Sequence, residues 1–368
     1  ALVLTNTIEE KILARIPFVL TDAQRQVCKE ISDDLAKTIP MNRLLQGDVG
    51  SGKTAVAVHA MLNAIAHGHQ AVLLAPTEIL AEQHLRTVEE MLKGSRVRIA
   101  GMTGSLRTAD RAIVVNGLAS GDFDMAVGTH ALLGEEIRFK SLAIAIIDEQ
   151  HRFGVEQRAA LRAKGATPQQ VPHTLVMTAT PIPRTLALSF FGDLEVSSLR
   201  GLLPGRTAPT TRVMPSIRAP EVYAWLKTRI ERGEQAFVVV PAIQESEMGL
   251  KDVASHAKSL AEGPLHGCRI GQLHGQMKSA ECDQVMDDFR AGKIDVLVAT
   301  IIIEVGVDIP NATVMVIEHA ERFGLAQLHQ LRGRVGRGGK PGYCVLIGDP
   351  PSDIAQGRFD TIANSTDG

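Results

Sequence analysis

The stretch Gly47-Asp48-Val49-Gly50-Ser51-Gly52-Lys53-Thr54 lies between a short strand-like run, residues 43–46, and a helix-like segment, residues 53–66. It fits the pattern GxxxxGK[ST], whose glycines let backbone N–H groups wrap phosphates at the N-terminus of a helix. In this pattern the lysine reaches the β- and γ-phosphates, and the threonine hydroxyl holds Mg²⁺. The alternative is a glycine-rich turn that only leads into a helix. The order of strand, loop and helix favours a nucleotide site, with candidate residues Gly47, Gly50, Ser51, Gly52, Lys53 and Thr54.

Two acidic residues, Asp148 and Glu149, follow the apolar run LAIAII at residues 142–147. Acids at the carboxyl end of a buried parallel strand face the crevice in which α/β sheets bind ligands. We therefore expect Asp148 to carry Mg²⁺ through water, and Glu149 to orient or deprotonate the attacking water. Taken alone, two acids at this point are equally typical of a solvated loop. The phosphate-loop pattern upstream favours the catalytic interpretation.

Spaced cationic residues occur near the other end of the chain, in the stretch QLRGRVGR at residues 330–337. They fit either a solvated basic helix end or arginine fingers that bind phosphate. Guanidinium groups suit phosphate oxygens bidentately and neutralise charge on a transferred phosphoryl group. Arginines delivered from a second lobe would make hydrolysis depend on lobe closure.

Strand-like and helix-like segments alternate along both halves of the chain. This pattern predicts βαβ units and parallel sheets covered by helices on both faces, which is an α/β fold with two tandem lobes. The stretch at residues 201–215 is rich in Pro, Gly and Thr and reads as a linker. We place lobe 1 at residues 1–205, lobe 2 at residues 206–350, and the start of a truncated C-terminal segment at residues 351–368.

Composition narrows the class of protein. The 368 residues include 45% hydrophobic and 22% charged residues with a net charge of −2, which is typical of a globular protein and not of a disordered or fibrous one. The four cysteines form no CxxC pair, which argues against a zinc site and a disulfide framework and favours a cytoplasmic protein. No apolar run approaches a membrane span, and the first residues lack the features of a signal peptide.

The set of motifs resembles the superfamily 2 helicases, which have two RecA-like lobes with ATP bound between them. GDVGSGKT (47–54), APTEILAEQH (75–84), VGTHALL (127–133), DEQHRFGV (148–155) and TATPIPRT (178–185) resemble motifs I, Ia, Ib, II and III. QLHGQMK (272–278), VATIIIEVGVDIPNA (298–312) and QLHQLRGRVGRG (327–338) resemble parts of motifs IV, V and VI. Within the superfamily the set is most similar to the RecG family of bacterial DNA helicases.

The resemblance implies roles for individual residues, ATP and Mg²⁺ as cofactors, and DNA as the partner. The implied ATP-site residues, besides those of the phosphate loop and Asp148, are the base Glu149, the γ-phosphate sensors Gln330, Arg334 and Arg337, the ribose neighbours Gly306 and Asp308, and the adenine neighbours Phe18 and Gln24. The implied DNA track comprises Pro76, Thr77, Gly128, Thr129, His130 and Thr300. Coupling of hydrolysis to lobe motion is implied for His151, Thr178 and Thr180. Each polar residue of the DNA track has an alternative role as a turn or cap residue.

Two departures from the family pattern stand out. Ile301 occupies a position in motif V where the family normally has a second threonine, and it has no hydroxyl to offer to a phosphate. The family also carries an N-terminal wedge domain and a C-terminal helical hairpin, and neither is expected within these residues. The chain therefore resembles the motor core of a longer protein.

The expected function is an ATP-dependent DNA helicase or translocase core of the RecG type, a monomeric motor that remodels stalled forks and Holliday junctions in recombination and repair. One alternative is the related double-stranded DNA translocase that couples transcription to repair. An RNA helicase is less favoured, because Gln150 and His151 replace the usual ending of the DEAD sequence. A further alternative is a nucleotide-gated clamp that binds DNA with little hydrolysis.

Overall fold

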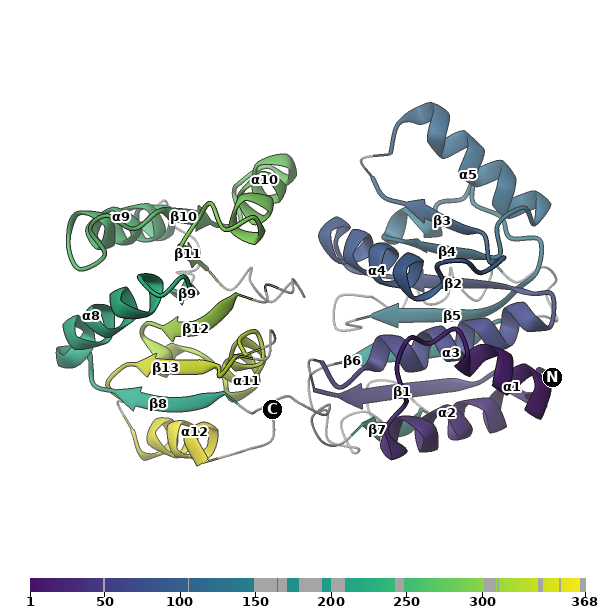
Figure 1. Cartoon of the computed structure of the whole chain (residues 1–368), viewed down its shortest axis with the longest axis horizontal. Helices are drawn as coiled ribbons and strands as arrows, with labels where there is room; N and C mark the ends of the chain where they lie inside the picture. Colours follow the sequence, from purple (N-terminus) through teal and green to yellow (C-terminus); the bar gives the residue numbers. More distant parts are fainter. Residues whose placement is uncertain are drawn as a thin grey trace. The chain divides into compact units, whose positions relative to one another are not determined.

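The structure is a computed structural model, and it describes residues 1–48, 50–104, 106–148, 164, 171–178, 194–199, 209–241, 248–300, 309, 311–336, 340–350 and 352–364. The chain divides into two compact units, Ala1–Arg200 and Gly201–Gly368. Each unit is built on one parallel sheet flanked by helices, which confirms the predicted fold class (Figure 1). Within the described ranges, no helix is long and apolar enough to cross a membrane.

The sheet of unit 1 has seven strands in the order β3-β4-β2-β5-β6-β1-β7, and every pair is parallel. The strands are β1 (Asn42–Gly47), β2 (Gln70–Leu74), β3 (Ile99–Met102), β4 (Met125–Gly128), β5 (Leu142–Asp148), β6 (His173–Thr178) and β7 (Glu195–Leu199). The central strands are short apolar runs because both faces of the sheet are covered. In β5, for example, Ile144 and Ile146 pack in one core cluster and Ala145 and Ile147 in another.

Five helices and one 3-10 turn surround this sheet in the described residues of unit 1: α1 (Asn6–Leu13), α2 (Asp22–Leu35), α3 (Lys53–Ala66), α4 (Glu78–Met91), α5 (Thr108–Ser120) and η1 (His130–Leu133). Apolar residues of α1, α2 and α3 share one core cluster, whereas α5 and η1 contribute to the other. Fully buried leucine or isoleucine side chains each contribute about 1.5–3 kcal/mol to the free energy of unfolding. The two layers of helices therefore hold the strands, and with them the loops at the strand ends.

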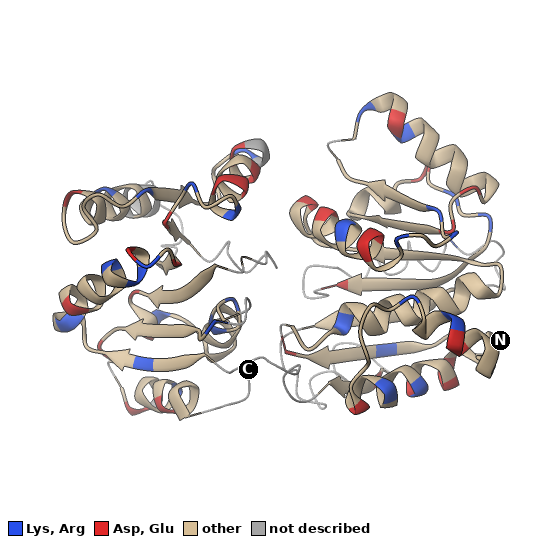
Figure 2. Ribbon diagram, viewed as in Figure 1, with Lys and Arg blue, Asp and Glu red and all other residues tan. Residues whose placement is uncertain are grey.

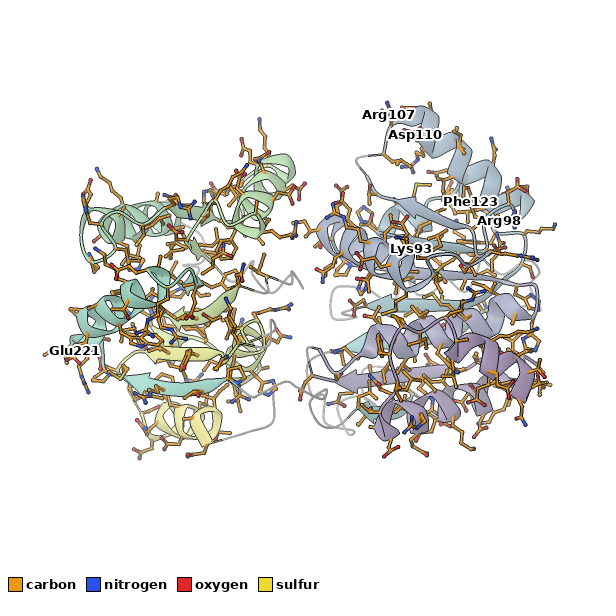
Figure 3. The ribbon with its side chains drawn as sticks, in the orientation of Figure 1. Lys93, Arg98, Arg107, Asp110, Phe123 and Glu221 are labelled. Atoms are coloured by element: carbon orange, nitrogen blue, oxygen red, sulfur yellow. The ribbon has the colours of Figure 1, made fainter. Side chains whose placement is uncertain are left out.

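Local signals set the ends of these helices. The loop before α5 ends at Arg107, whose guanidinium pairs with Asp110 at 2.9 Å in the first turn (Figure 3). At the other end Gly121 takes the left-handed conformation with φ 84°, which stops the helix. Phe123 then folds back against Gly117, where an added Cβ would lie only 2.6 Å from its ring. The turn after α5 therefore leads the chain directly into β4.

Unit 2 repeats the same plan with six strands in the order β10-β11-β9-β12-β13-β8, again all parallel. The strands are β8 (Thr210–Met214), β9 (Gln235–Val239), β10 (Ile270–Leu273), β11 (Val296–Ala299), β12 (Ala312–Ile317) and β13 (Tyr343–Ile347). The described helices and 3-10 turns are η3 (Ser216–Arg218), α8 (Ala219–Ile230), α9 (Met248–Glu262), α10 (Ser279–Arg290), η5 (Ala320–Arg322), α11 (Leu325–Arg332) and α12 (Asp353–Asn364). Figure 2 shows that the strands carry few charged residues and the helices carry most of them.

One expectation about local structure differs from the structure. The linker at residues 201–215 contains a strand, β8, which pairs with β13 along the edge of the second sheet. Its Thr-rich sequence has a high strand propensity, but it forms a strand because it pairs with the distant strand β13.

Candidate nucleotide-binding site

The phosphate loop joins β1 to α3 at the carboxyl edge of the first sheet. Gly50 and Gly52 take φ values of 81° and 85°, a left-handed conformation that residues with a Cβ rarely adopt. Gly52 is also the N-cap of α3, so the helix begins at Lys53 with its first backbone N–H groups turned toward the loop. A helix N-terminus preceded by such a loop is a binding site for anions.

Lys53 is held against the loop itself. Its Nζ donates to the carbonyl oxygens of Gly47 at 2.5 Å and Asp48 at 2.8 Å. The ammonium group therefore lies against the loop. Lys53 itself belongs to the first turn of α3, which would face a bound phosphate. Thr54, the next residue, lies half-buried in the first turn of α3.

The loop is closely packed and carries a buried hydroxyl without a partner. Ser51 is 5% exposed, and its Oγ makes no hydrogen bond with any described residue. A Cβ on Gly47 would lie 2.7 Å from that Oγ and 2.9 Å from the Cβ of Leu199, so only glycine fits there. A buried hydroxyl beside the N-terminus of a helix suits a ligand rich in acceptor oxygens, such as a polyphosphate.

Gln24 connects the start of α2 to the phosphate loop. Its Oε1 accepts from the N–H of Thr21 at 2.9 Å, and the Thr21 hydroxyl accepts from the N–H of Gln24 at 3.2 Å, which is a capping box. Its Nε2 donates to the carbonyl of Ser51 at 3.0 Å. Gln24 therefore supports the loop, while Phe18 lies exposed ahead of α2. The contacts of both residues with adenine stay predictions.

Asp148 ends β5 and is 8% exposed. Its Oδ2 lies 2.7 Å from Nε2 of His84, which belongs to α4. Both side chains of this pair are 12% exposed, so the contact is nearly shielded from water. His84 was not predicted from the sequence, because nothing in its local pattern shows that α4 places it at the end of β5.

The strand register brings the predicted residues of lobe 1 to one edge. Asp148 pairs with Met177, and Thr178 pairs with Gln46, the residue before Gly47. Asp148, Thr178 and the phosphate loop therefore follow one another on three adjacent strands, β5, β6 and β1.

The described residues contain no cluster of three His, Cys, Asp or Glu side chains suited to a metal. This edge suits Mg²⁺, which binds through one or two protein oxygens and takes its other ligands from phosphate and water.

The predicted DNA-track residues of lobe 1 lie on two neighbouring loops at the same edge. Pro76 and Thr77 follow β2. Gly128 is the last residue of β4, which pairs with β2, and Thr129 and His130 follow it. Ala75 donates its N–H to the carbonyl of Gly128 at 2.9 Å, so the two loops touch.

The two threonines of these loops act as helix caps. The hydroxyl of Thr77 accepts from Leu80 N–H at the start of α4, and that of Thr129 accepts from Ala131 N–H at the start of η1. Thr129 is 1% exposed, whereas His130 is exposed. His130 is therefore the side chain of this pair of loops best placed to meet a partner.

In unit 2 the predicted residues lie around α11 and β11. Arg334 is buried at 4% exposure just after the end of α11, and Gln330 is half-buried within that helix. Arg332, between them, donates to the carbonyl of Ile362 at 2.7 Å and thereby ties α11 to α12. Thr300 follows β11 and is 8% exposed. The remaining predicted residues, Glu149, His151, Thr180, Gly306, Asp308 and Arg337, and the motif positions Gln150 and Ile301, lie outside the described residues.

Comparison with known proteins yields two family matches. The DEAD/DEAH box helicase family matches residues 21–188, and the helicase conserved C-terminal domain matches residues 221–339. The ATP-dependent DNA helicase RecG of Synechocystis sp. is 49% identical over 360 residues, which cover 98% of this chain and 43% of that protein. RecG of Escherichia coli K12 is 47% identical over 365 residues, which cover 99% of this chain and 53% of that protein. The chain spans about half the length of the curated relatives it matches.

Solved structures of helicases are also similar to this chain. A structure of RecG bound to a three-way DNA junction is similar with a TM-score of 0.85 at 42% identity, over 99% of this chain and 47% of that chain. Yeast Dbp5 bound to RNA and ADP BeF3 is similar with a TM-score of 0.69 at 19% identity, over 99% of this chain and 92% of that chain. At that identity the second likeness concerns the fold alone.

Proposed function

The chain belongs to the superfamily 2 helicases and corresponds to the helicase core of RecG proteins, and from this premise we propose that it is an ATP-driven motor that moves on double-stranded DNA. The observation that supports the proposal best is the shared carboxyl edge of the first sheet. The phosphate loop, Asp148 and Thr178 lie on one part of that edge, and the two loops predicted to contact DNA lie on another. One rigid sheet thus carries both proposed sites.

The phosphates are handled by the loop and by Lys53. In the structure the ammonium group donates hydrogen bonds to two loop carbonyls, so it has to turn outward to meet the β- and γ-phosphates. The N–H groups at the start of α3 and the Ser51 hydroxyl supply further donors. These donors stabilise the charge that develops on the γ-phosphoryl group.

We assign metal binding to Thr54 and Asp148, and proton transfer to Glu149. A bound Mg²⁺ ion would neutralise charge between the β- and γ-phosphate oxygens. Thr54 and Asp148 would hold it, and Glu149 would take the proton from the attacking water. Gln330, Arg334 and Arg337 of the second lobe would stabilise the γ-phosphate. Phe18 and Gln24 would contact adenine, and Gly306 and Asp308 would contact ribose. Residues His151, Thr178 and Thr180 would couple the two lobes.

The proposed DNA partner is a branched duplex, as at stalled forks and Holliday junctions, processed by a monomeric motor in the cytoplasm. The RecG neighbour was solved on a three-way DNA junction, which supports this class of substrate. Pro76, Thr77, Gly128, Thr129, His130 and Thr300 would contact the backbone through hydroxyl and N–H groups. Such contacts track DNA without reading its sequence and weaken as salt concentration rises.

The proposal is tested by steady-state ATP hydrolysis with duplex DNA, single-stranded DNA, a four-way junction and RNA. We expect stimulation by DNA and not by RNA. Lys53→Ala should lower the turnover rate by about 10²–10³-fold, because it removes a cation from the developing charge. Full activity of this variant would contradict the proposed site.

A second measurement separates a motor from a clamp. Nucleotide-dependent DNA affinity without phosphate release would identify a nucleotide-gated clamp instead. Ile301→Thr provides a matched variant, because it restores the hydroxyl that motif V normally carries. If DNA stimulates hydrolysis only in Ile301→Thr, the isoleucine limits coupling.

A further inference from the structure

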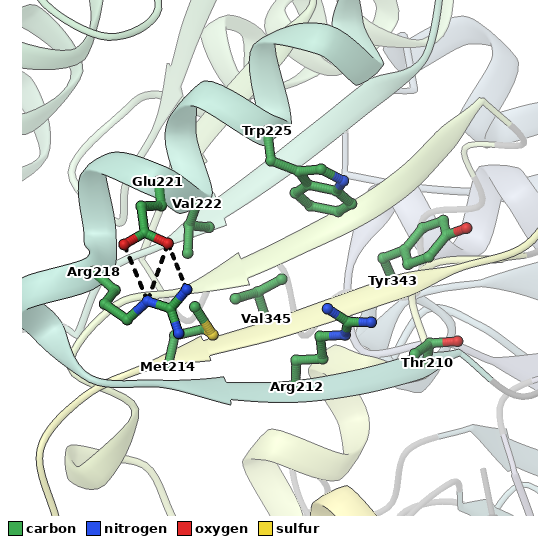
Figure 4. A pocket seen from close by; sticks show the side chains of 9 residues that line it. All are labelled: Thr210, Arg212, Met214, Arg218, Glu221, Val222, Trp225, Tyr343 and Val345. Carbon is green, nitrogen blue, oxygen red and sulfur yellow. Dashed lines mark hydrogen bonds and ion pairs between the residues drawn. The ribbon is translucent and has the colours of Figure 1, made fainter.

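A pocket of about 290 Å³ lies on unit 2, beside the edge of its sheet (Figure 4). Its floor is formed by alternate residues of β8 and β13, and one wall is formed by α8. In the parallel register Thr210 pairs with Tyr343 at one end, and Arg212 pairs with Val345 in the middle. None of these residues belongs to the motifs assigned to nucleotide or DNA, so the pocket is independent of the proposed motor site.

The lining of the pocket carries one uncompensated positive charge. Arg218 and Glu221 neutralise each other, with Nη2 of the arginine 2.6 Å from Oε2 of the glutamate. Arg212 is exposed, and it has no ion pair or hydrogen bond with any residue that the structure describes. A guanidinium group in this state favours an anion, because it offers several donors in one plane.

Neutral donors without partners lie at the same part of the pocket. Over the described ranges, the side chains of Thr210, Trp225 and Tyr343 also make no hydrogen bond. Figure 4 shows the Arg218–Glu221 pair at one end of the pocket and Thr210 and Tyr343 at the other. The end of the pocket that carries the unpaired donors therefore lies opposite the end that carries the neutral ion pair.

The aromatic wall is fixed in place. The rings of Trp225 and Tyr343 meet edge to face, with centroids 5.5 Å apart. The guanidinium of Arg229 lies 4.5 Å from the centroid of the Tyr343 ring, and Glu234 holds that guanidinium at 2.9 Å. Such cation–π and edge-to-face contacts order the rings before any ligand arrives. With Val222 and Val345 beside them, the rings form an apolar surface of stable shape.

We propose that this pocket binds a carboxylic acid with an aromatic or branched aliphatic body, with the carboxylate at Arg212 and the body against Trp225 and the valines. A cavity of about 290 Å³ is at the small end of ligand sites, so it suits one side-chain-sized group. A nucleic acid backbone is a poor match, because the lining has a single free cation among the described residues. The acid can be a free small molecule or the end of a peptide.

Trp225 makes the proposal directly testable, since it is the only tryptophan in the 368 residues. Its fluorescence therefore reports on this pocket alone. We would titrate the chain with 3-phenylpropionate, with the neutral 3-phenylpropanamide and with acetate. The expected result is a saturable change with 3-phenylpropionate, at a midpoint at least about tenfold lower than for the other two, because only it joins the charge to the apolar body. A hexapeptide of glycine and serine ending in phenylalanine tests whether a chain end is accepted.

Two variants assign the effect to Arg212. Arg212→Gln should raise the 3-phenylpropionate midpoint by about tenfold or more, since a charge-assisted bond is lost. Lys227→Gln removes a cation from α8 outside the pocket lining, and it should leave the midpoint unchanged. Circular dichroism melting shows that both variants fold. Equal responses to the acid and its amide, a response that does not saturate, or an unchanged midpoint in Arg212→Gln would each overturn the proposal.

Discussion

His84 and Asp148 lie 2.7 Å apart, between Nε2 and Oδ2, at the carboxyl edge of the first sheet. They are 64 residues apart in the chain. Helix α4, which carries His84, begins at the Thr77 cap next to the loop predicted to contact DNA. At about 1.5 Å per residue, the step of seven residues from Thr77 to His84 spans about 10 Å of helix. A short rigid helix thus joins the proposed DNA loop to the carboxylate proposed to hold the metal.

We predict that His84→Ala weakens metal use and its coupling to DNA. Without the contact to His84, Asp148 would be oriented less firmly, and loss of such an outer contact typically costs about 10–100-fold in metal affinity or activity. The Mg²⁺ concentration for half-maximal hydrolysis should rise, and stimulation by DNA should fall. Hydrolysis measured over a series of Mg²⁺ concentrations, with and without duplex DNA, checks both.

The control for this variant is His84→Gln, whose amide N–H can still donate to the carboxylate. It should recover part of the loss. Binding of a fluorescent ATP analogue without metal should be the same in all three proteins, because the phosphate loop is unchanged. If His84→Ala shows the wild-type Mg²⁺ dependence, His84 does not position Asp148.

Two buried histidines make the stability of unit 1 sensitive to acid. Burial lowers the pKa of His59 to about 4 and that of His173 to about 4, and Nδ1 of His173 accepts the N–H of Met41 at 2.9 Å. Both pKa values lie below the ordinary 6.5, so the unfolded chain binds protons more readily. Stability is therefore full above pH 6.5 and is lost as pH falls toward 4. At pH 5 the loss is about 2 kcal/mol for each histidine.

Urea unfolding at pH 7 and pH 5 measures this effect. His173→Asn keeps an acceptor for Met41 but cannot titrate, and His59→Leu removes the second titrating group. Each variant should reduce the difference between the two pH values by roughly half, and the double variant should nearly abolish it. An unchanged difference in the double variant would assign the acid sensitivity to other groups.

Local sequence signals predicted β1, β5 and the phosphate loop, because those features depend on neighbouring residues. The apolar run LAIAII is typical of a strand that is covered on both faces of a sheet, and the glycines of residues 47–52 are typical of a tight turn. Neither prediction depends on where the rest of the chain lies. Features that depend on distant partners were missed. The strand β8 exists through its pairing with β13, and the role of His84 depends on where α4 crosses the end of β5. The capping roles of Thr77 and Thr129 could be assigned only from the observed starts of α4 and η1.

Gly128 has a packing role that is separate from any contact with DNA. A Cβ at this position would lie 2.0 Å from the carbonyl oxygen of Met102 and 2.9 Å from Cδ1 of Leu132. That same carbonyl accepts the N–H of Thr129 at 3.1 Å. Gly128→Ala should therefore push β4 from β3 and lower the free energy of unfolding by about 1–3 kcal/mol.

Thermal melting compares this variant with Gly357→Ala. Gly357 lies in α12 with nothing within 4 Å of an added Cβ, so alanine should stabilise the helix by about 0.5–1 kcal/mol. The two substitutions make the same chemical change and should move the melting temperature in opposite directions. A harmless Gly128→Ala would show that β3 and β4 can separate easily at this edge.

Arg43 links three elements of unit 1, namely β1, α2 and β7. It lies in β1 at 6% exposure, and its Nε donates to Asp34 of α2 at 2.7 Å while its Nη1 donates to Ser197 of β7 at 2.7 Å. Its Nη2 also bonds to Glu195. Burial alone would raise the pKa of Asp34, but hydrogen bonds from Lys37 and Arg43 outweigh it and lower that pKa below its usual value. Asp34 therefore favours folding above pH 3.8, and this contribution is lost as pH falls through its lowered pKa.

Removing only the arginine should cost more than replacing the arginine together with Asp34. Arg43→Met leaves the Asp34 carboxylate buried with Lys37 as its remaining cation, and breaking a buried pair in this way costs about 3–5 kcal/mol. In Arg43→Met with Asp34→Leu no such charge remains, and apolar packing should recover most of that loss. Urea unfolding of the two single variants and the double variant gives the coupling energy. Additive losses would show that the two residues stabilise unit 1 independently, through their other partners.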